Sequence, residues 1–469
     1  FDGGYGLTAP ALARVLRHQP SVVVTCDCGS SDHVSLEQLR DQGVDCLVID
    51  HHLVPDAPLP ALAFLNPHRP ECQYPYKGLA SCGLALSVVA ELRTQLGAKF
   101  DLKSLLDLVA IGTIADVAPL TVDNRALVRA GLKALENPQR KGLQALMRRA
   151  RIEPGRPVTA EDVAFRIAPR LNAPGRLGRA TPALELLLAK TDADAERLAE
   201  DIEAVQLARR AQQEAMLADA AEEIERSGWL SQAALVVGKE SYNVGIVGIV
   251  AGKLAERYGR PVVVYGAEQG VARGSVRGPE GTPLFDLVRA ASACLVRYGG
   301  HHAAAGLELE LARVDEFRQL FVRVAEERAA LGGQTRTPDG REVLLLDAED
   351  DPMRVAEELL LLEPCGEGNR LPLLGIVGRL ATARELRGGH LRVELQRERG
   401  DLIAGFGPNL GERAGQLKSP LLAVGSLRVS TFGGQKRAEL LLNHLASAQA
   451  GIEPASKRAG AVLDAGGVP

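Results

Sequence analysis

The sequence lacks any apolar run long enough to cross a membrane. It contains no stretch of about 18 consecutive apolar residues and no pattern of a secretory signal peptide. It also lacks a strong charge of either sign, because its formal net charge is -4 at pH 7. These absences predict a protein without a membrane partner. They argue against adhesion to nucleic acid over the whole surface, although a local basic channel is compatible with them.

Cysteine is too scattered to form a disulfide framework. The seven cysteines are an odd number without regular spacing, which favours the reducing environment of the cytoplasm. Cys26 and Cys28 flank Asp27 and could form part of a metal site. Because no second Cys or His pair at zinc-finger spacing accompanies them, we interpret both as small packing residues.

Two apolar runs end abruptly at polar residues. Residues 22–26 stop at Asp27, and residues 46–49 stop at the triplet Asp50-His51-His52, with a helix predicted between them over residues 34–42. Such runs are typical of buried parallel strands joined in a βαβ unit. Ligands bind outside the carboxyl ends of the strands in open α/β sheets, so Asp27 and the triplet are expected to face one crevice.

Ionisable groups at the end of an apolar strand are costly to desolvate unless they are paired or bind a cation. Asp27 and the triplet Asp50-His51-His52 therefore predict a polar or metal-binding site. The alternative is that a carboxylate caps the next helix and that the two histidines lie on the surface.

A further carboxylate follows a predicted helix. The apolar spacing predicts amphipathic helices over residues 84–96, which Gly97 would end, and over residues 102–111. We interpret residues 112–119 as a loop that carries Asp116 next to a buried helix. The alternative is that Asp116 caps the helix predicted around residues 124–135.

Several arginine- and glycine-rich segments predict binding of an anion. Residues 170–177 are interpreted as a loop in which guanidinium groups surround a Pro-Gly turn. Solvation at the surface is the alternative for any single arginine. Glycine-flanked polar residues also occupy two predicted loops, residues 273–278 and 298–306, where free backbone N–H groups would form an anion nest. The candidate residues in these segments are Arg170, Asn172, Arg176, Ser275, Arg277, Gly299, Gly300 and His301.

The middle of the chain predicts a long helix followed by a second α/β unit. Residues 192–226 contain neither Gly nor Pro, which favours one long, mostly exposed helix that connects two domains. Strands are predicted over residues 233–237 and 261–265, with a helix over residues 245–258 between them.

Strictly alternating strands predict a small barrel of the oligonucleotide-binding (OB) type in the C-terminal part. A polar linker over residues 332–340 precedes it, and a β-sandwich is the alternative. From residue 446 onward Ala, Gly and Pro dominate, and we expect a disordered tail. The predicted strands lie near residues 374–382, 390–395, 401–406, 421–431 and 438–444.

The order of these motifs resembles the DHH phosphoesterase superfamily and, within it, the RecJ-type exonucleases specific for single strands. The resemblance rests on Cys26-Asp27-Cys28-Gly29, Asp50-His51-His52, the segment 112–119 with Asp116, and Gly299-Gly300-His301. Residues 4–7, 169–177 and 362–369 are also similar to that subfamily. The resemblance implies an α/β fold with these parts: a parallel-sheet DHH domain (1–178), a connector helix (179–228), a DHHA1 domain (229–332), an OB-like β-barrel domain (341–447) and a disordered tail (448–469).

The resemblance implies a metal-dependent phosphodiesterase with two Mn²⁺ or Mg²⁺ ions that degrades single-stranded DNA from the 5′ end to mononucleotides, in DNA repair and recombination. Asp27 would bridge the metals, with His51 and Asp116 as further ligands, while Asp50 and His52 would orient ligands or contact the scissile phosphate. Substrate would be bound by the anion-binding candidates, with the 5′ phosphate held by Ser275, Arg277, His301 and Arg176. Single-stranded DNA is the expected partner, together with a single-strand-binding protein and a helicase.

The sequence departs from the family pattern at its beginning. The chain starts with Phe1, and the family's first strand with its pair of aspartates has no counterpart ahead of residues 4–7. We therefore expect a fragment in which Asp2 is not a ligand, which binds metal poorly and can lack activity. Asn243 and Val244 also replace an expected His-Pro, and Gly278 stands where a Ser is common.

Two alternatives remain open from the sequence. One is a DHH-family phosphodiesterase of short oligonucleotides or cyclic dinucleotides, against which the C-terminal β domain argues. The other is a catalytically silent scaffold that binds single strands. The presence of Asp27, His51 and Asp116 favours an enzyme.

Overall fold

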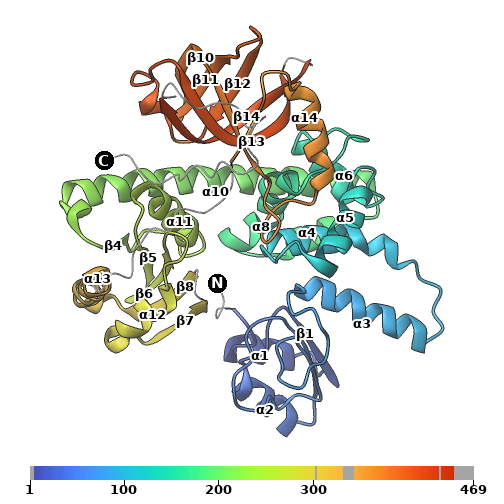
Figure 1. Ribbon diagram of the computed structural model, residues 1–469. Coiled ribbons are helices and arrows are strands. Elements are labelled where there is room, and N and C mark those ends of the chain that lie inside the picture. Colours follow the sequence, from blue (N-terminus) through green and yellow to red (C-terminus); the bar gives the residue numbers. More distant parts are fainter. Residues whose placement is uncertain (1–4, 302–303, 331–342, 433–434, 448–469) are drawn as a thin grey trace. The chain divides into compact units, whose positions relative to one another are not determined.

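The computed structural model describes residues 5–301, 304–330, 343–432 and 435–447 (Figure 1). Asp2, the linker over residues 332–340 and the tail over residues 448–469, for which we stated expectations, lie outside the described residues. The chain forms two compact units, each built from separate segments. Among the described residues, the larger unit contains residues 5–136, 157–164 and those from 343 to 447, and the smaller unit contains residues 137–156 and those from 165 to 330.

A parallel sheet opens the larger unit, as the sequence predicted. Its strand order is β1 (Val22–Cys26), β2 (Asp45–Ile49) and β3 (Ala63–Leu65), flanked in sequence by helices α1 (Ala9–Leu16) and α2 (His33–Asp41). The side chains of Leu36, Leu39 and Val48 are fully buried in its core. The prediction of a strand buried on both faces is wrong for β1, because Val22 and Val24 are 48% and 52% exposed on this edge strand.

Helices α3 (Ser81–Gln95), α4 (Leu106–Ala115) and α5 (Val122–Leu135) follow the sheet. Gly97 follows α3 at φ +61°, so it ends this helix as predicted. A Cβ at Gly131 would lie 2.1 Å from the carbonyl oxygen of Leu106, so only glycine allows α4 and α5 to come this close. The predicted loop over residues 112–119 is wrong in its first half, because α4 continues through Gly112 to Ala115.

The smaller unit is built around helix α10 (Asp192–Arg226), which has the predicted bounds. Helices α6 (Lys141–Arg149), α8 (Ala168–Leu177), α9 (Thr181–Leu188) and α11 (Val247–Tyr258) contact it. These neighbours bury one side of α10, including Ile202 and Ile224, while the residues of its other side are exposed, as the prediction of a mostly exposed helix requires. The predicted loop over residues 170–177 is wrong, since these residues belong to α8. Pro169 lies in its first turn.

A five-stranded sheet completes the smaller unit, with the order β4 (Leu235–Lys239), β5 (Val262–Glu268), β6 (Val271–Arg277), β8 (Ala304–Glu310) and β7 (Arg297–His301). Strands β4 and β5 are parallel, as expected for the second α/β unit. Helices α12 (Leu284–Ala290) and α13 (Val314–Ala330) pack on it in the same core. The two predicted anion-binding loops are wrong, because residues 273–277 and 297–301 are strands. Their backbones pair with neighbouring strands rather than standing free.

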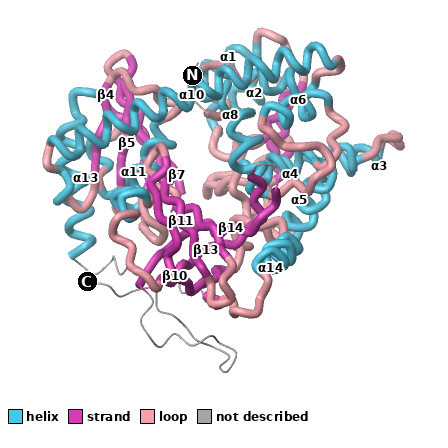
Figure 2. The backbone as a smooth tube through the Cα atoms, turned by 90° about the horizontal axis from the view of Figure 1, so that it is seen from above, coloured by secondary structure: helices cyan, strands magenta, loops and turns pink. Residues whose placement is uncertain are grey.

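The C-terminal β domain lies in the larger unit and consists of the predicted strands together with a short strand, β9 (Val343–Leu345), and helix α14 (Pro352–Leu359). Figures 1 and 2 show α14 beside the strands. Pairing runs from β11 through β12, β14 and β13 to β10, and β10 pairs again with β11. The strand bounds are β10 (Leu373–Leu386), β11 (His390–Gln396), β12 (Leu402–Gly407), β13 (Leu421–Phe432) and β14 (Gln435–Ser447).

No helix in the described part of the chain has both the length and the apolar character needed to span a membrane.

Candidate functional site

Three side chains converge where β1, β2 and α4 end. The Nε2 atom of His51 lies 3.3 Å from Oδ1 of Asp27 and 3.3 Å from Oδ2 of Asp116. Asp27 follows β1, His51 follows β2 by two residues, and Asp116 is the first residue after α4. The structure thus brings together residues from three separate predicted elements. The alternative in which Asp116 caps the next helix is wrong, because Thr121 occupies that position.

The backbone at Asp27 has an uncommon conformation that carries the chain out of the sheet. Asp27 has φ +66°, a value that residues other than glycine rarely adopt, while its N–H still donates to the carbonyl of Ile49 at 2.9 Å. Gly29 follows at φ +113°, and a Cβ there would lie 2.8 Å from Oγ1 of Thr25. The strand end is therefore fixed, and the Asp27 carboxylate remains about half exposed.

His51 has the properties of a metal ligand. Its Nε2 atom is buried and makes no hydrogen bond, although two carboxylates lie at 3.3 Å. A buried ring nitrogen without a hydrogen bond is uncommon in native proteins. Nitrogen and carboxylate oxygen atoms form a suitable donor set for Mn²⁺, so these residues fit a divalent cation. Asp27, His51 and His52 also offer ligand atoms that all lie within 4.8 Å of one another.

The electrostatics of the cluster favour a positive charge between the acids. Burial raises the pKa of Asp116, and the Asp27 carboxylate raises it further. Burial also raises the pKa of Asp27, but the nearby His51 imidazole outweighs this effect and the net shift is downward. Interaction with Asp27 in turn raises the pKa of His51. Two carboxylates therefore share one imidazole, and a bound cation would stabilise both in the ionised form.

Asp50 lies beneath this cluster and orients it. The residue is 1% exposed, and its carboxylate accepts the N–H of Ser30 at 3.1 Å and the N–H of His51 at 2.8 Å. Its Oδ1 atom also lies 2.7 Å from Nδ1 of His52. Burial raises the pKa of Asp50, but these hydrogen bonds outweigh it and hold the pKa well below its usual range. Asp50 is too enclosed to contact a phosphate, so of the two roles we predicted for it only the orienting one fits.

Asn66 is a site residue that the sequence analysis did not identify. It follows β3 in the same way that Asp27 follows β1 and Asp50 follows β2. Its side-chain amide donates to Oγ of Ser30 at 3.1 Å and to the carbonyl of His52 at 2.8 Å. An Asn-Pro pair directly after a short apolar run was the available signal in the sequence. The hydroxyl of Tyr5, which we also did not single out, donates to the carbonyl of Asp27.

A second cluster, in the smaller unit, gathers positive charge around the start of α11. Ser275 and Arg277 lie on β6 against Gly248, where a Cβ would be 3.2 Å from Oγ of Ser275 and 3.3 Å from a terminal nitrogen of Arg277. Arg176 on α8 donates to the carbonyl of Gly245 at 3.2 Å. Burial lowers the pKa of Arg277, and the positive charge of Arg176 lowers it further. A helix N-terminus and two guanidinium groups together form a site for an anion.

Arg209 adds a buried charge that the sequence analysis did not identify. The residue is 7% exposed on α10, and its guanidinium donates to the side-chain oxygens of Gln206 at 3.0 Å and Gln213 at 2.8 Å. Burial lowers its pKa, and Arg176 lowers it further. Within the described residues no carboxylate pairs with Arg176, Arg209 or Arg277, so the positive charge of this cluster is not neutralised.

The observed contacts do not connect the other predicted substrate-binding residues to this cluster. Arg170 forms a two-pronged ion pair with Glu203, at 2.6 Å and 3.0 Å, which occupies its guanidinium. Asn172 is exposed on α8. Gly299 and Gly300 are exposed on β7 and pair with β8. The backbone of His301 belongs to β7, but its side chain lies outside the described part.

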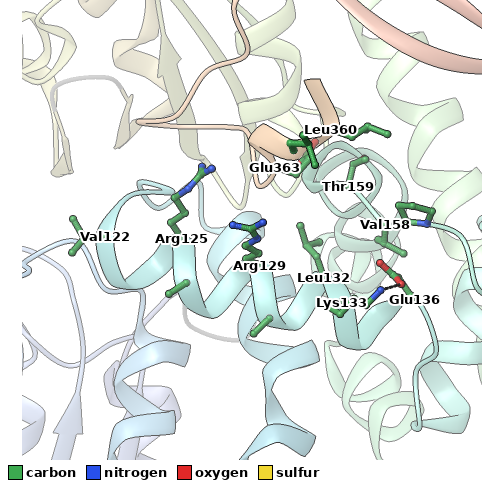
Figure 3. Close-up of a pocket in the computed structure, with 14 residues that line it drawn as sticks. Val122, Arg125, Arg129, Leu132, Lys133, Glu136, Val158, Thr159, Leu360 and Glu363 are labelled. Atoms are coloured by element: carbon green, nitrogen blue, oxygen red, sulfur yellow. Dashed lines mark hydrogen bonds and ion pairs between the residues drawn. The ribbon is translucent and has the colours of Figure 1, made fainter. Parts of the chain in front are cut away.

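A cavity of 720 Å³ in the larger unit contains none of the candidate metal ligands. Helix α5 lines one side with Arg125, Arg129 and Lys133, and Leu360 and Glu363 lie opposite (Figure 3).

Three family models match the chain in sequence. The N-terminal domain of the DHH family matches residues 6–113, the DHHA1 domain matches residues 231–327, and the RecJ OB domain matches residues 344–444. The OB match identifies the fold of the β domain and rules out the β-sandwich alternative.

Several proteins of known name are similar over almost the whole chain. The single-stranded-DNA-specific exonuclease RecJ of Dickeya dadantii is 33% identical over 95% of this chain and 81% of its own length. The protein of the same name from Bacillus subtilis is 32% identical over 95% of this chain, which spans 56% of that protein. The crystal structure of RecJ from Thermus thermophilus in complex with Mn²⁺ has a TM-score of 0.77 and 33% identity, with 94% of this chain and 64% of that chain covered.

These similarities extend through both units and include every domain that carries a candidate site residue. The alignment with the Dickeya dadantii protein, at 33% identity, covers most of both chains. The three domain models match this chain in the order DHH, DHHA1 and RecJ OB. The chain therefore belongs to the RecJ family of single-stranded-DNA-specific exonucleases.

Proposed function

We propose that this protein is a metal-dependent exonuclease that hydrolyses single-stranded DNA from its 5′ end to mononucleotides. The observation that carries the proposal is the position of His51 Nε2, buried without a hydrogen bond at 3.3 Å from both Asp27 and Asp116. Such a set of donors fits a divalent cation, and the relatives at 32% and 33% identity are named single-stranded-DNA-specific exonucleases.

In this proposal Asp27, His51 and Asp116 would hold Mn²⁺ or Mg²⁺. When bound, a pair of such ions activates the attacking water and stabilises the charge on the leaving oxygen. The residues of this chain position the reaction. Asp50 fixes the ring of His52 through the 2.7 Å contact, and Asn66 holds the backbone of His52 and the side chain of Ser30. His52 is thereby held in one orientation beside Asp27, where it can contact the scissile phosphate or add a ligand.

The cluster of Ser275, Arg277 and Arg176 is proposed to hold the 5′-terminal phosphate. A terminal phosphate carries more negative charge than an internal one, so an uncompensated cluster of guanidinium groups favours a DNA end over the middle of a strand. The positive charge of Arg209 adds to the electrostatic attraction of this cluster for an anion, because its hydrogen-bond partners are neutral. This selection of an end would make the enzyme an exonuclease.

A role in DNA repair and recombination follows from this activity, with single-stranded DNA as the substrate. Duplex DNA must be unwound before such an enzyme can act. We therefore propose a helicase and a single-strand-binding protein as partners. The seven free cysteines support our proposal that the protein works in the reducing cytoplasm.

The proposal is tested by following mononucleotide release from a 5′-phosphorylated single strand by the full-length protein. We expect release to require Mn²⁺ or Mg²⁺ and to fall by at least about 100-fold in Asp27→Ala. Asp41→Ala is a matched control, because Asp41 is an exposed carboxylate at the end of α2. If Asp27→Ala retains the wild-type rate, the metal assignment is wrong. A wild-type protein that binds single strands but never cleaves them would instead support the silent scaffold.

A further inference from the structure

The loop that leads into the β domain has a compact structure of its own. We call residues 362–369 the entrance loop, which runs from the short helix η6 (Leu360–Leu362) toward β10. The N–H of Gly366 donates to the carbonyl of Asn369 at 2.9 Å, and the N–H of Asn369 donates back at 3.1 Å. The side chain of Asn369 also donates to the carbonyl of Pro364 at 2.7 Å. These hydrogen bonds make the entrance loop an ordered turn rather than a flexible linker.

The entrance loop contacts the segment that follows Asp116. The N–H of Leu120, which is 2% exposed, donates to the carbonyl of Glu367 at 2.7 Å. A Cβ at Gly366 would lie 2.9 Å from Cδ1 of Leu120. At Gly368, a Cβ would lie 3.1 Å from Cγ2 of Thr121, and φ there is +69°. Both glycines therefore allow the loop to reach the chain only a few residues beyond Asp116.

Two charged side chains fasten the same loop. The guanidinium of Arg125, in the first turns of α5, donates to the carbonyls of Leu362 at 2.8 Å and Pro364 at 3.2 Å. Figure 3 shows Arg125 pointing from α5 toward the chain around Glu363. The carboxylate of Glu363 accepts the N–H of Ala160 at 3.2 Å and the N–H of Cys365 at 3.0 Å. The loop is thus attached to helix α5 and to residues 157–164 of the same unit.

The segment between Asp116 and Leu120 has little freedom to absorb a shift. The N–H of Asp116 donates to the carbonyl of Gly112 at 3.0 Å, and the N–H of Ala118 donates to the carbonyl of Thr113 at 3.2 Å. The carbonyl of Pro119 accepts the hydroxyl of Tyr76 and the side-chain amide of Asn124, both at 3.0 Å. The segment is held by these residues on one side and by the entrance loop on the other. A displaced loop would consequently move Asp116.

We infer that the entrance loop is a positioning element for the metal ligand Asp116, through which the β domain influences how tightly the catalytic centre binds its cation. The inference rests on the proposed function, because it takes Asp116 as a ligand. In this view residues 362–369 do more than connect the β domain to the rest of the chain, because they also hold Asp116 in position. Gly368 and Arg125 are positioning residues in this arrangement, since they act through the segment 117–121.

The test compares two substitutions of glycine in the β domain. Gly368→Ala introduces a Cβ against Thr121 and Pro119, whereas Gly389→Ala has a similar backbone conformation, φ +75°, with no atom within 4 Å of the new Cβ. Mn²⁺ binding to the full-length protein is measured directly, from the electron paramagnetic resonance signal of free Mn²⁺. We expect the affinity to fall about 10-fold in Gly368→Ala and to stay at the wild-type value in Gly389→Ala.

The kinetic readout separates positioning from general damage. In Gly368→Ala the Mn²⁺ concentration for half-maximal cleavage should rise about 10-fold, while KM for DNA at saturating Mn²⁺ stays unchanged. If Gly368→Ala does not fold, Arg125→Lys replaces it, because lysine keeps the charge but lacks the planar guanidinium whose two terminal nitrogens each bond one carbonyl, and the same shift is expected.

Equal Mn²⁺ affinity in the wild type and in the variant that folds would overturn this inference and leave the proposed function intact. A wild-type protein that binds no Mn²⁺ would overturn the proposed function itself.

Discussion

Asp50 and His52 form the most enclosed ionic contact of the candidate metal centre, with 2.7 Å between Oδ1 and Nδ1 and 1% exposure of Asp50. The contact lies within one short stretch of chain, yet neither strand pattern nor residue spacing indicates which of the three polar residues after β2 turns inward. The backbone N–H groups of Ser30 and His51 decide this, because they converge on the Asp50 carboxylate.

Asp50→Asn should destabilise the protein by about 2 to 3 kcal/mol at pH 7, because hydrogen bonds to a buried charge are worth more than those to a neutral amide. The folded-state pKa of Asp50 lies below its ordinary value, so its stabilisation is present above pH of about 4 and is lost as the pH falls through the folded-state pKa. Urea unfolding at pH 7 and at pH 3 measures this effect. The difference between wild type and variant should shrink at the lower pH, and a constant difference would contradict it.

Arg277→Ala should impair cleavage of 5′-phosphorylated strands by about 10-fold or more and affect 5′-hydroxyl strands less, because the guanidinium recognises the terminal phosphate. Arg273→Ala is a control on the same strand, since Arg273 is exposed and pairs with Glu308 at 3.3 Å. The measurement is kcat/KM for the two substrates. Equal losses on both ends in Arg277→Ala would argue against a pocket that recognises the end.

Cys28→Ser should retain Mn²⁺ binding and cleavage within about 2-fold of the wild type, because a packing residue tolerates this isosteric change. Burial raises the pKa of Cys28 to about 11, so the thiol is protonated at pH 7 as long as no cation binds it. Metal titration of the variant tests this prediction. A loss of metal affinity comparable to that of Asp27→Ala would instead support the alternative in which Cys26 and Cys28 bind a metal.

Gly131→Ala should destabilise the larger unit by about 3 kcal/mol, because the new methyl group would lie 2.1 Å from the carbonyl oxygen of Leu106 and push α4 away from α5. Gly252→Ala in α11 offers a contrast, since its Cβ meets nothing closer than 4.0 Å and alanine favours the helix by about 0.5 to 1 kcal/mol. Chemical unfolding measures both. Similar effects of the two substitutions would mean that the α4–α5 contact is looser than described.

The sequence by itself determined the parallel βαβ start, the bounds of α10 and the strands of the β domain, since each depends on a local periodicity of apolar residues. It also placed Asp27 and His51 at one edge of the sheet, because parallel strands end on the same side. Three predicted loops proved to be helix or strand. Glycine and proline there signalled turns, but contacts with α10 and with neighbouring strands were strong enough to complete regular structure around Pro174, Gly274 and Gly299.

Only the tertiary structure decided which charges meet. Arg170 and Arg176 lie on one short helix, but Glu203 of α10 neutralises the first and leaves the second near the start of α11. In the sequence, Arg209 is one of many charged residues of a helix predicted to be mostly exposed. In the structure, neighbouring residues bury its side chain. Asn66 gained its role because β3 ends beside β2. These outcomes depend on distances between residues far apart in the chain, and no local pattern of residue types contains them.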